Sequence, residues 1–284
     1  MFGSKGGDRT MLETLAYGYG LLEGPRVDDA GNLFFSDVTN GGVYRRAPDG
    51  TISTVVPRRR GVGGIALHAD GGVVISGKDV CHVKDGTTRV LFRRDDIPGF
   101  NDLFTDSAGR VLVGSLRSDP FKPGTRVPGE LWRIDGEGKV VQMYGDVGLT
   151  NGIGFSPDGL LLYHADSAAQ HLIVHDVAPD GSCSNRRSMP ISVGGPDGLA
   201  VDEAGAIWVA IYNGGCAARF TSTGKLDRKI DVPAKAVTSL CFGGPDRRDL
   251  YIVTADNTDD PERKGTIFRT RVDIAGLSAP LARV

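Results

Sequence analysis

We predict that this 284-residue chain folds as an all-β, six-bladed β-propeller, with four-stranded antiparallel blades around a central channel. Three observations support this fold: an excess of glycine, evenly spaced turn signals, and a repeat of about 43 residues. Glycine contributes 41 residues, roughly twice its usual share. The 15 prolines follow no collagen period. This composition indicates many tight turns and excludes a helical bundle.

Short apolar runs, rich in β-branched and aromatic residues, lie between turn sequences such as APDG, SPDG and DEAG. Asp closes such turns with its own side chain, and Gly supplies the positive φ that they need. The runs are too short for helices and have the composition of strands. The predicted strands include 33–36, 73–76, 111–113, 160–163, 207–211 and 250–254.

The turns superimpose when nine-residue segments are aligned on them. The segments begin at Glu23, Gly63, Asn101, Asn151, Asp197 and Thr238. Successive starts are 40, 38, 50, 46 and 41 residues apart. Each repeat unit has room for four strands, so six units give six blades. A β-sandwich also has regular turns, but it does not require a superimposable period of this length.

The chain shows no interdomain linker. We therefore predict one propeller domain over 11–284, preceded by a flexible tail at 1–10. Either the LETLAY segment at 12–17 or the GLSAPLARV segment at 276–284 has the composition for the outermost strand that closes the ring.

The net charge and the cysteine content limit which partners and which cellular location we expect. The net charge of −2 provides no basic field for nucleic acid or an anionic membrane. The four cysteines are scattered, without the paired spacing of a zinc ribbon or the density of a disulfide scaffold. No signal-peptide core and no apolar stretch of membrane-spanning length occur. We expect reduced thiols, a cytoplasmic location and a monomer, and we expect the arginine run at 58–60 to be a solvated loop rather than an anion site.

The first residue of each aligned segment holds the same place before an innermost strand, so all six are expected at one mouth of the channel. Four of them carry oxygen ligands: Glu23, Asn101, Asn151 and Asp197. Carboxylates and amide carbonyls suit a hard cation such as Ca²⁺, Mg²⁺ or Mn²⁺, whereas structural zinc prefers His and Cys. The alternative is that these side chains cap local turns. Three acceptors at one register position favour the cation.

Four motifs carry a family resemblance: LLEGP, FNDLFTDSAGRVLVGS, TNGIGFSPDG and GGPDGLAVDEAGAIWVA. In these motifs the chain resembles the senescence marker protein/gluconolactonase family, which includes regucalcin and bacterial sugar lactonases, from about residue 21 to the end. The resemblance implies one divalent cation held by Glu23, Asn151 and Asp197. It also implies that Asp197 is the general base and that Asn101 contacts the substrate.

One position departs from the family. Sugar lactonases of this type often have an arginine two residues before that asparagine, and this chain has Gly99 there. Arg117, in a long loop, is the candidate replacement donor to the substrate.

The resulting hypothesis is a metal-dependent lactonase of a small sugar-acid lactone, with Ca²⁺ as the first expectation and Zn²⁺, Mn²⁺, Mg²⁺ or Fe²⁺ as alternatives. There are two competing hypotheses. The protein hydrolyses another ester or an organophosphate, or it is a non-enzymatic calcium-binding propeller.

Overall fold

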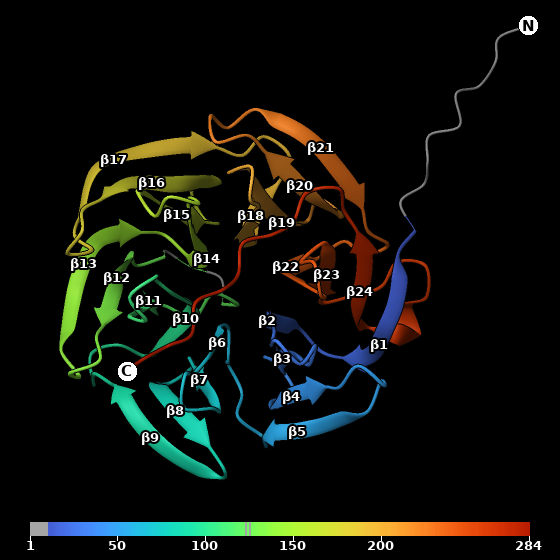
Figure 1. The fold of residues 1–284 in the computed structure, drawn as a ribbon, viewed down its shortest axis with the longest axis horizontal. Coiled ribbons are helices and arrows are strands. Elements are labelled where there is room, and N and C mark those ends of the chain that lie inside the picture. The colour runs from blue at the N-terminus through green and yellow to red at the C-terminus, as the bar shows by residue number, and fades with distance from the viewer. Residues whose placement is uncertain (1–10, 123, 125) are drawn as a thin grey trace, which may run out of the picture.

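The structure is a computed structural model that describes residues 11–122, 124 and 126–284. The predicted tail at 1–10 lies outside the described residues. The rest forms a ring of six four-stranded antiparallel sheets, which confirms the all-β, six-bladed propeller (Figure 1). Among the described residues, the only helix is a three-residue 3-10 turn, Pro261–Arg263, and no helix has the length and apolar character to cross a membrane.

The blades are numbered in chain order, and the strands of each are given from the channel outward. Blade 1 contains β2 (Leu22–Val27), β3 (Leu33–Asp37), β4 (Val43–Arg46) and β5 (Ile52–Val56). Blade 2 contains β6 (Ile65–Leu67), β7 (Val73–Ile75), β8 (Val80–Lys84) and β9 (Thr87–Phe92). Blade 3 contains β10 (Gly99–Thr105), β11 (Val111–Leu116), β12 (Gly129–Ile134) and β13 (Val140–Val147).

The second half of the ring has the same plan. Blade 4 contains β14 (Thr150–Phe155), β15 (Leu161–Asp166), β16 (His171–Val177) and β17 (Cys183–Pro190). Blade 5 contains β18 (Gly195–Val201), β19 (Ile207–Tyr212), β20 (Cys216–Phe220) and β21 (Leu226–Asp231). Blade 6 contains β22 (Val237–Gly243), β23 (Asp249–Thr254), β24 (Gly265–Arg271) and β1 (Glu13–Tyr19).

The turn after each inner strand follows the predicted Asp–Gly chemistry. The Asp106 carboxylate accepts hydrogen bonds from two backbone N–H groups of its turn, both at 3.0 Å, and Gly109 has a φ of 83°. Asp202 and Gly205, at φ 78°, repeat this arrangement in blade 5. The carboxylate closes the turn and glycine adopts the left-handed conformation at little steric cost. The repeat in the sequence is therefore a repeat of turn geometry.

The N-terminal segment closes the ring. β1 pairs with β24 as the outermost strand of blade 6, so the first and last blades of the chain share one sheet. The C-terminal segment instead crosses one face of the ring (Figure 1). Its backbone N–H groups at Leu277, Ala282 and Arg283 donate to carbonyls at or just after the ends of β18, β6 and β10. The segment therefore covers the channel end opposite the one where the inner strands begin.

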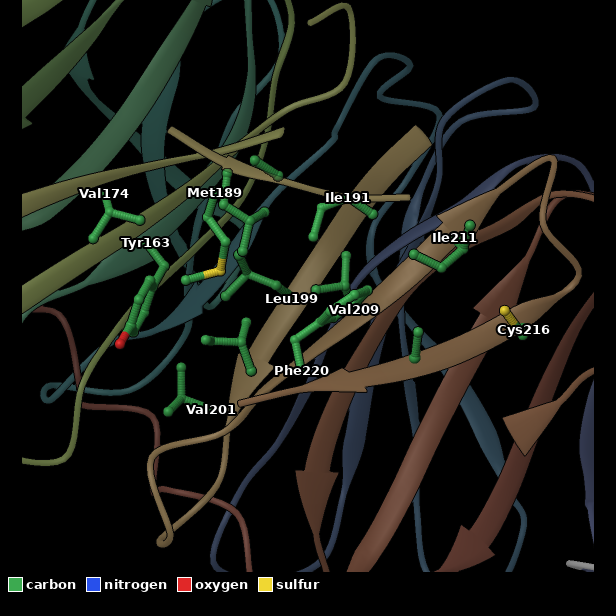
Figure 2. Packing of buried hydrophobic residues seen from close by; sticks show 14 residues of the cluster. Tyr163, Val174, Met189, Ile191, Leu199, Val201, Val209, Ile211, Cys216 and Phe220 are labelled. Atoms are coloured by element: carbon green, nitrogen blue, oxygen red, sulfur yellow. The ribbon is translucent and has the colours of Figure 1, made fainter. Parts of the chain in front are cut away.

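Six buried apolar clusters fill the six interfaces between adjacent blades. Figure 2 shows the one between blades 4 and 5, where Tyr163 and Met189 pack against Leu199, Val209 and Phe220. A single propeller blade has two apolar faces and buries both only in a closed ring. Complete closure of the ring is thus the condition for burying the core.

A buried histidine at the interface of blades 3 and 4 makes stability depend on pH. His164 of β15 is fully buried and its Nδ1 lies 2.9 Å from the Tyr144 hydroxyl. Burial lowers the pKa of His164 from 6.5 to about 3. The unfolded chain therefore binds this proton more readily than the native one, and the native state loses stability as pH falls from 6.5 toward 3.

We expect the free energy of unfolding to fall by up to about 1.4 kcal/mol per pH unit across that window through His164 alone. Denaturant melts from pH 7 to pH 4 measure this slope. His164→Gln is expected to flatten it, and His171→Gln, at a partly exposed position, to leave it unchanged. An equal slope in wild type and His164→Gln would contradict this assignment.

Candidate metal and substrate site

The predicted site residues lie at the beginning of the inner strands, where the sheets are irregular. In five of the six inner strands the pairing register shifts at or next to the aligned position, as between Glu23 and Arg26 or between Phe100 and Leu103. A β-bulge re-aims side chains away from strict alternation and is common beside functional sites. Here the bulges form a ring of irregular backbone around one mouth of the channel.

The two predicted amides are joined directly. Asn101 Nδ2 donates to Asn151 Oδ1 and to the Thr150 carbonyl, each at 2.7 Å. Asn151 Nδ2 donates to Ser167 Oγ at 2.6 Å, and Ser167 in turn donates to the Pro196 carbonyl. These hydrogen bonds fix the orientation of the Asn151 side-chain amide. Its Oδ1 therefore faces Asn101 and keeps a second lone pair available.

Three carboxylates are buried around these amides: Glu23, Asp102 and Asp197, with 8%, 5% and 5% of their surface exposed. Burial, followed by the nearby charges of Asp197 and Asp102, raises the pKa of Glu23 well above its usual range. Burial and Asp102 likewise raise the pKa of Asp197. Burial raises the pKa of Asp102 to about 6, against the opposing charge of Arg26. The three acids thus share a dry region and repel one another.

Arg26 is the cation that faces this group. Its guanidinium donates to the Pro25 and Leu103 carbonyls at 2.7 and 3.1 Å and lies 5.4 Å from the ring centre of Phe104. With all three acids ionised, three carboxylates and one guanidinium carry two excess negative charges, as many as one divalent cation neutralises. Buried charges are stable only when paired or bound to a metal.

One donor atom in this group has no protein partner. Among the described residues, Asp197 Oδ1 is buried and accepts no hydrogen bond. A buried carboxylate oxygen without a partner is costly, and a cation ligand would satisfy it. The described residues contain no group of three or more His, Cys, Asp and Glu side chains spaced to hold a metal. The predicted donor set instead combines the two carboxylates Glu23 and Asp197 with the amide of Asn151, which is the chemistry of a hard cation.

The other two aligned positions support the site without contributing ligands. A Cβ atom on Gly63 would lie 2.2 Å from Asn101 Oδ1, so only glycine leaves room for that amide. Thr238 Oγ1 donates to the carbonyls of Leu22 and Val253 at 2.6 and 3.1 Å and is fully buried. Thr238 therefore joins blade 6 to blade 1.

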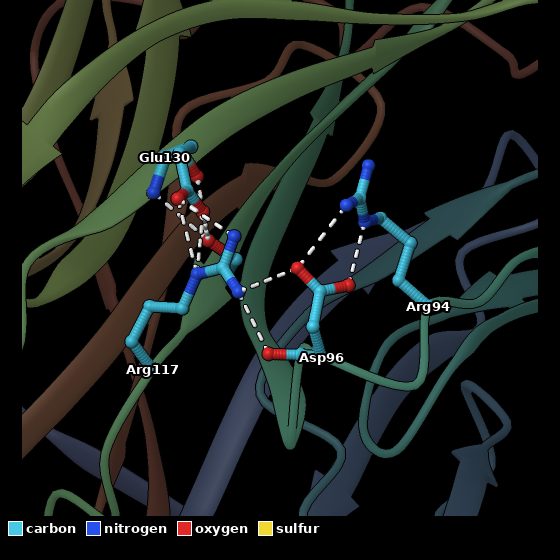
Figure 3. A network of polar contacts seen from close by, with 5 residues as sticks. Arg94, Asp96, Arg117 and Glu130 are labelled. Carbon is cyan, nitrogen blue, oxygen red and sulfur yellow. Dashed lines mark hydrogen bonds and ion pairs between the residues drawn. The ribbon is translucent and has the colours of Figure 1, made fainter.

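Arg117 has a full set of protein partners (Figure 3). Its Nε and Nη2 donate to the Glu130 carboxylate at 2.8–3.1 Å, and Nη1 donates to the carbonyl and carboxylate of Asp96 at 2.7 and 3.0 Å. Asp96 is also held by Arg94. The expected contact of Arg117 with substrate stays a prediction, and this network favours a role in anchoring the segment that follows β11.

We expect Arg117→Gln to lower the free energy of unfolding by about 1–3 kcal/mol, because it leaves the half-buried Glu130 carboxylate without its guanidinium. KM for a lactone is expected to change less than twofold. Arg93→Gln is the control, because Arg93 is 63% exposed in a loose pair at 3.8 Å. A large rise in KM with unchanged stability would assign Arg117 to the substrate instead.

Three residues of this region were not predicted from the sequence: Asp102, Arg26 and Tyr212. Tyr212 ends β19 with 36% of its surface exposed, and burial and the charge of Asp197 raise its pKa. Asp102 directly follows Asn101, and strict alternation would place the two on opposite faces of a strand. Only the bulge brings both into the channel region. Only Arg26 gave a sequence signal for this buried polar group, because it is a lone guanidinium at a position where the strand pattern predicts a buried side chain.

These features define a class of protein: a β-propeller with buried carboxylates and amides gathered at one mouth of its channel. The chain belongs to the SMP-30/Gluconolactonase/LRE-like family, whose model matches residues 21–256. A 6-deoxy-6-sulfogluconolactonase of Pseudomonas putida is 32% identical over 267 residues, 88% of this chain and 90% of that protein.

Two other relatives extend the comparison. A pentonolactonase of Haloferax volcanii is 32% identical over 271 residues, 89% of this chain and 90% of that protein. The crystal structure of a calcium-binding protein, regucalcin, from Agrobacterium tumefaciens superimposes with a TM-score of 0.85 at 22% identity, covering 97% of this chain and 98% of that one. At that identity the structural likeness supports the fold alone.

Proposed function

We propose that this protein is a divalent-cation-dependent lactonase that opens small sugar-acid lactones. The observation that carries the proposal is the group of three buried carboxylates at the channel mouth, with two uncompensated charges and an unpartnered oxygen on Asp197. The full-length relatives named as lactonases act on a sulfogluconolactone and a pentonolactone. Both substrates are sugar-acid lactones, which is the class we propose here.

The residues present fit a resident cation. Glu23, Asn151 and Asp197 would hold it through oxygen atoms, with Ca²⁺ first among the candidates and Zn²⁺, Mn²⁺, Mg²⁺ and Fe²⁺ as alternatives. When bound, such an ion polarises a carbonyl as a Lewis acid and stabilises the developing negative charge by several kcal/mol.

The chain's own residues supply position and proton transfer. Asn101 uses its Nδ2 for Thr150 and Asn151, so its Oδ1 remains to accept a hydrogen bond from a sugar hydroxyl. The other carboxylate oxygen of Asp197, Oδ2, would take the proton of the water that attacks the lactone carbonyl, and the ring C–O bond then breaks as its oxygen gains a proton. Burial keeps bulk water away from this carboxylate, which is 5% exposed, so the proton is transferred to a positioned base and not to solvent.

The test is hydrolysis of glucono-1,5-lactone and a panel of aldonolactones and simple lactones, followed by proton release. The protein is first stripped with a chelator and then given Ca²⁺, Mg²⁺, Mn²⁺, Zn²⁺ or Fe²⁺ in turn. Cation-dependent turnover that is lost in Asn151→Ala supports the proposal. Tight cation binding without turnover of any lactone would overturn it in favour of a binding propeller.

The glycine at position 99 supports a second candidate function, the hydrolysis of another ester or an organophosphate. A Cβ atom there would meet only the Gly77 backbone, at 3.4 Å and beyond, so no side chain crowds the position where sugar lactonases of this type often have an arginine. The same panel, extended to a phenyl ester and a phosphotriester, ranks the two. A monomeric state and a cytoplasmic location stay predictions.

A further inference from the structure

A basic cavity lies where the chain passes from blade 1 to blade 2. Its volume is about 400 Å³, and it is lined by Val56, Pro57, Arg58, Arg59, Arg60 and Lys78. Four of the six lining residues are cationic, and they come from two separate segments of the chain. The run at 58–60 thus lines one concavity together with Lys78.

Most of this positive charge is uncompensated. Arg59 pairs with Asp79, with 2.5 Å between Nη2 and Oδ1, and also donates to the Ser76 carbonyl. Arg58, Arg60 and Lys78 are exposed and form no ion pair within the described parts of the chain. Three unpaired cations around one hollow repel one another, and their combined field attracts an anion.

The cavity adjoins the proposed site through two glycines. A Cβ atom on Gly77 would lie 3.6 Å from the Arg59 guanidinium, and Gly77 exchanges backbone hydrogen bonds of 3.2 and 2.7 Å with Phe100, next to Asn101. On the other side, Gly63 contacts the Asn101 amide and follows Arg60 by three residues. Three residues span at most about 10 Å between Cα atoms, so Arg60 lies no farther than that from Gly63.

Gly99 opens the path between the two. The only atoms near its missing side chain are those of the Gly77 carbonyl, at 3.4 and 4.0 Å. A substrate held at Asn101 can therefore extend past Gly99 toward Arg59 and its neighbours without meeting a side chain from this position.

We propose that this cavity binds an anionic substituent (a phosphate, sulfonate or carboxylate) carried by the lactone at the end remote from its ring carbonyl. The inference rests on the proposed lactonase function and specifies its substrate class. Arg60 and Lys78 provide the free charge, and Arg59, which pairs with Asp79, also lines the cavity. Guanidinium and ammonium groups are the donors that proteins use for such anions.

The experiment compares kcat/KM for glucono-1,5-lactone with that for 6-phosphoglucono-1,5-lactone, each corrected for its uncatalysed rate. Wild type is expected to favour the phosphorylated lactone. Arg60→Gln and Lys78→Met are each expected to lower kcat/KM for that substrate about tenfold, the scale of one charge-assisted hydrogen bond, and to change the neutral lactone less than twofold. Arg248→Gln, an exposed arginine at the opposite end of the channel, is expected to change neither.

A second measurement separates this inference from the proposed function. Calorimetric titration of 6-phosphogluconate and gluconate needs no turnover, and tighter binding of the phosphorylated acid that is lost in Arg60→Gln supports the anion site even if no lactone is hydrolysed. Equal effects of the variants on both lactones, or equal binding of both acids by wild type, overturns the inference and leaves the lactonase function standing.

Discussion

Replacing Asp197 by asparagine is expected to lower kcat about 10²–10⁴-fold at saturating cation, while the protein still folds and binds its ion. The variant keeps an oxygen ligand at Oδ1 but cannot accept the proton of the attacking water, and a positioned general base contributes a rate factor of this size. The loss should fall on kcat more than on KM, because the carboxylate acts in the transition state rather than in substrate binding. Initial rates of lactone hydrolysis measure both constants.

The matched control is Asp95→Asn, which removes one carboxylate charge from a side chain that is 97% exposed before β10. Its kcat is expected to match wild type. If Asp197→Asn takes up cation and hydrolyses lactones at the wild-type rate, Asp197 is a ligand only, and the base lies elsewhere.

Replacing Glu23 by glutamine is expected to reduce the stabilisation by the cation and to raise the stability of the cation-free protein. Glu23 is buried against Asp197 and Asp102, whose charges raise its pKa, so removing its carboxylate relieves repulsion in a dry region. Wild type gains about 2.7 kcal/mol at a free cation concentration of 100 Kd. In a protein of this size, that gain corresponds to several degrees in Tm.

Thermal melts with chelator and with added Ca²⁺ or Mn²⁺ measure both effects. The control is Glu203→Gln, whose side chain is 49% exposed at the other end of the channel and whose cation response should match wild type. An undiminished cation-induced shift in Glu23→Gln would place the ion elsewhere.

The sequence predicts the architecture well because the repeat consists of turn residues that recur in each blade. Asp106 and Gly109, like Asp202 and Gly205, recur because each blade needs the same hairpin. The aligned segments begin within two residues of the start of all six inner strands. Which terminus closes the ring could not be predicted, because β1 and the C-terminal segment have similar composition and only pairing with β24 decides between them.

The site is predictable only in part, and the limit has a physical cause. Register alignment brings Asn101 beside Asn151, as their 2.7 Å hydrogen bond demonstrates. The bulges at the same positions then bring in Asp102 and Arg26, which alternation assigns to other faces. A bulge has no reliable residue signature, so the charge balance of the channel emerges only from the three-dimensional structure.

The most direct measurement is an anomalous difference map from crystals grown with Ca²⁺ or Mn²⁺. We predict one strong peak at the channel mouth, within about 2.1–2.6 Å of oxygen atoms from Glu23, Asn151 and Asp197. A peak elsewhere, or saturating cation with no peak among these three side chains, would contradict it.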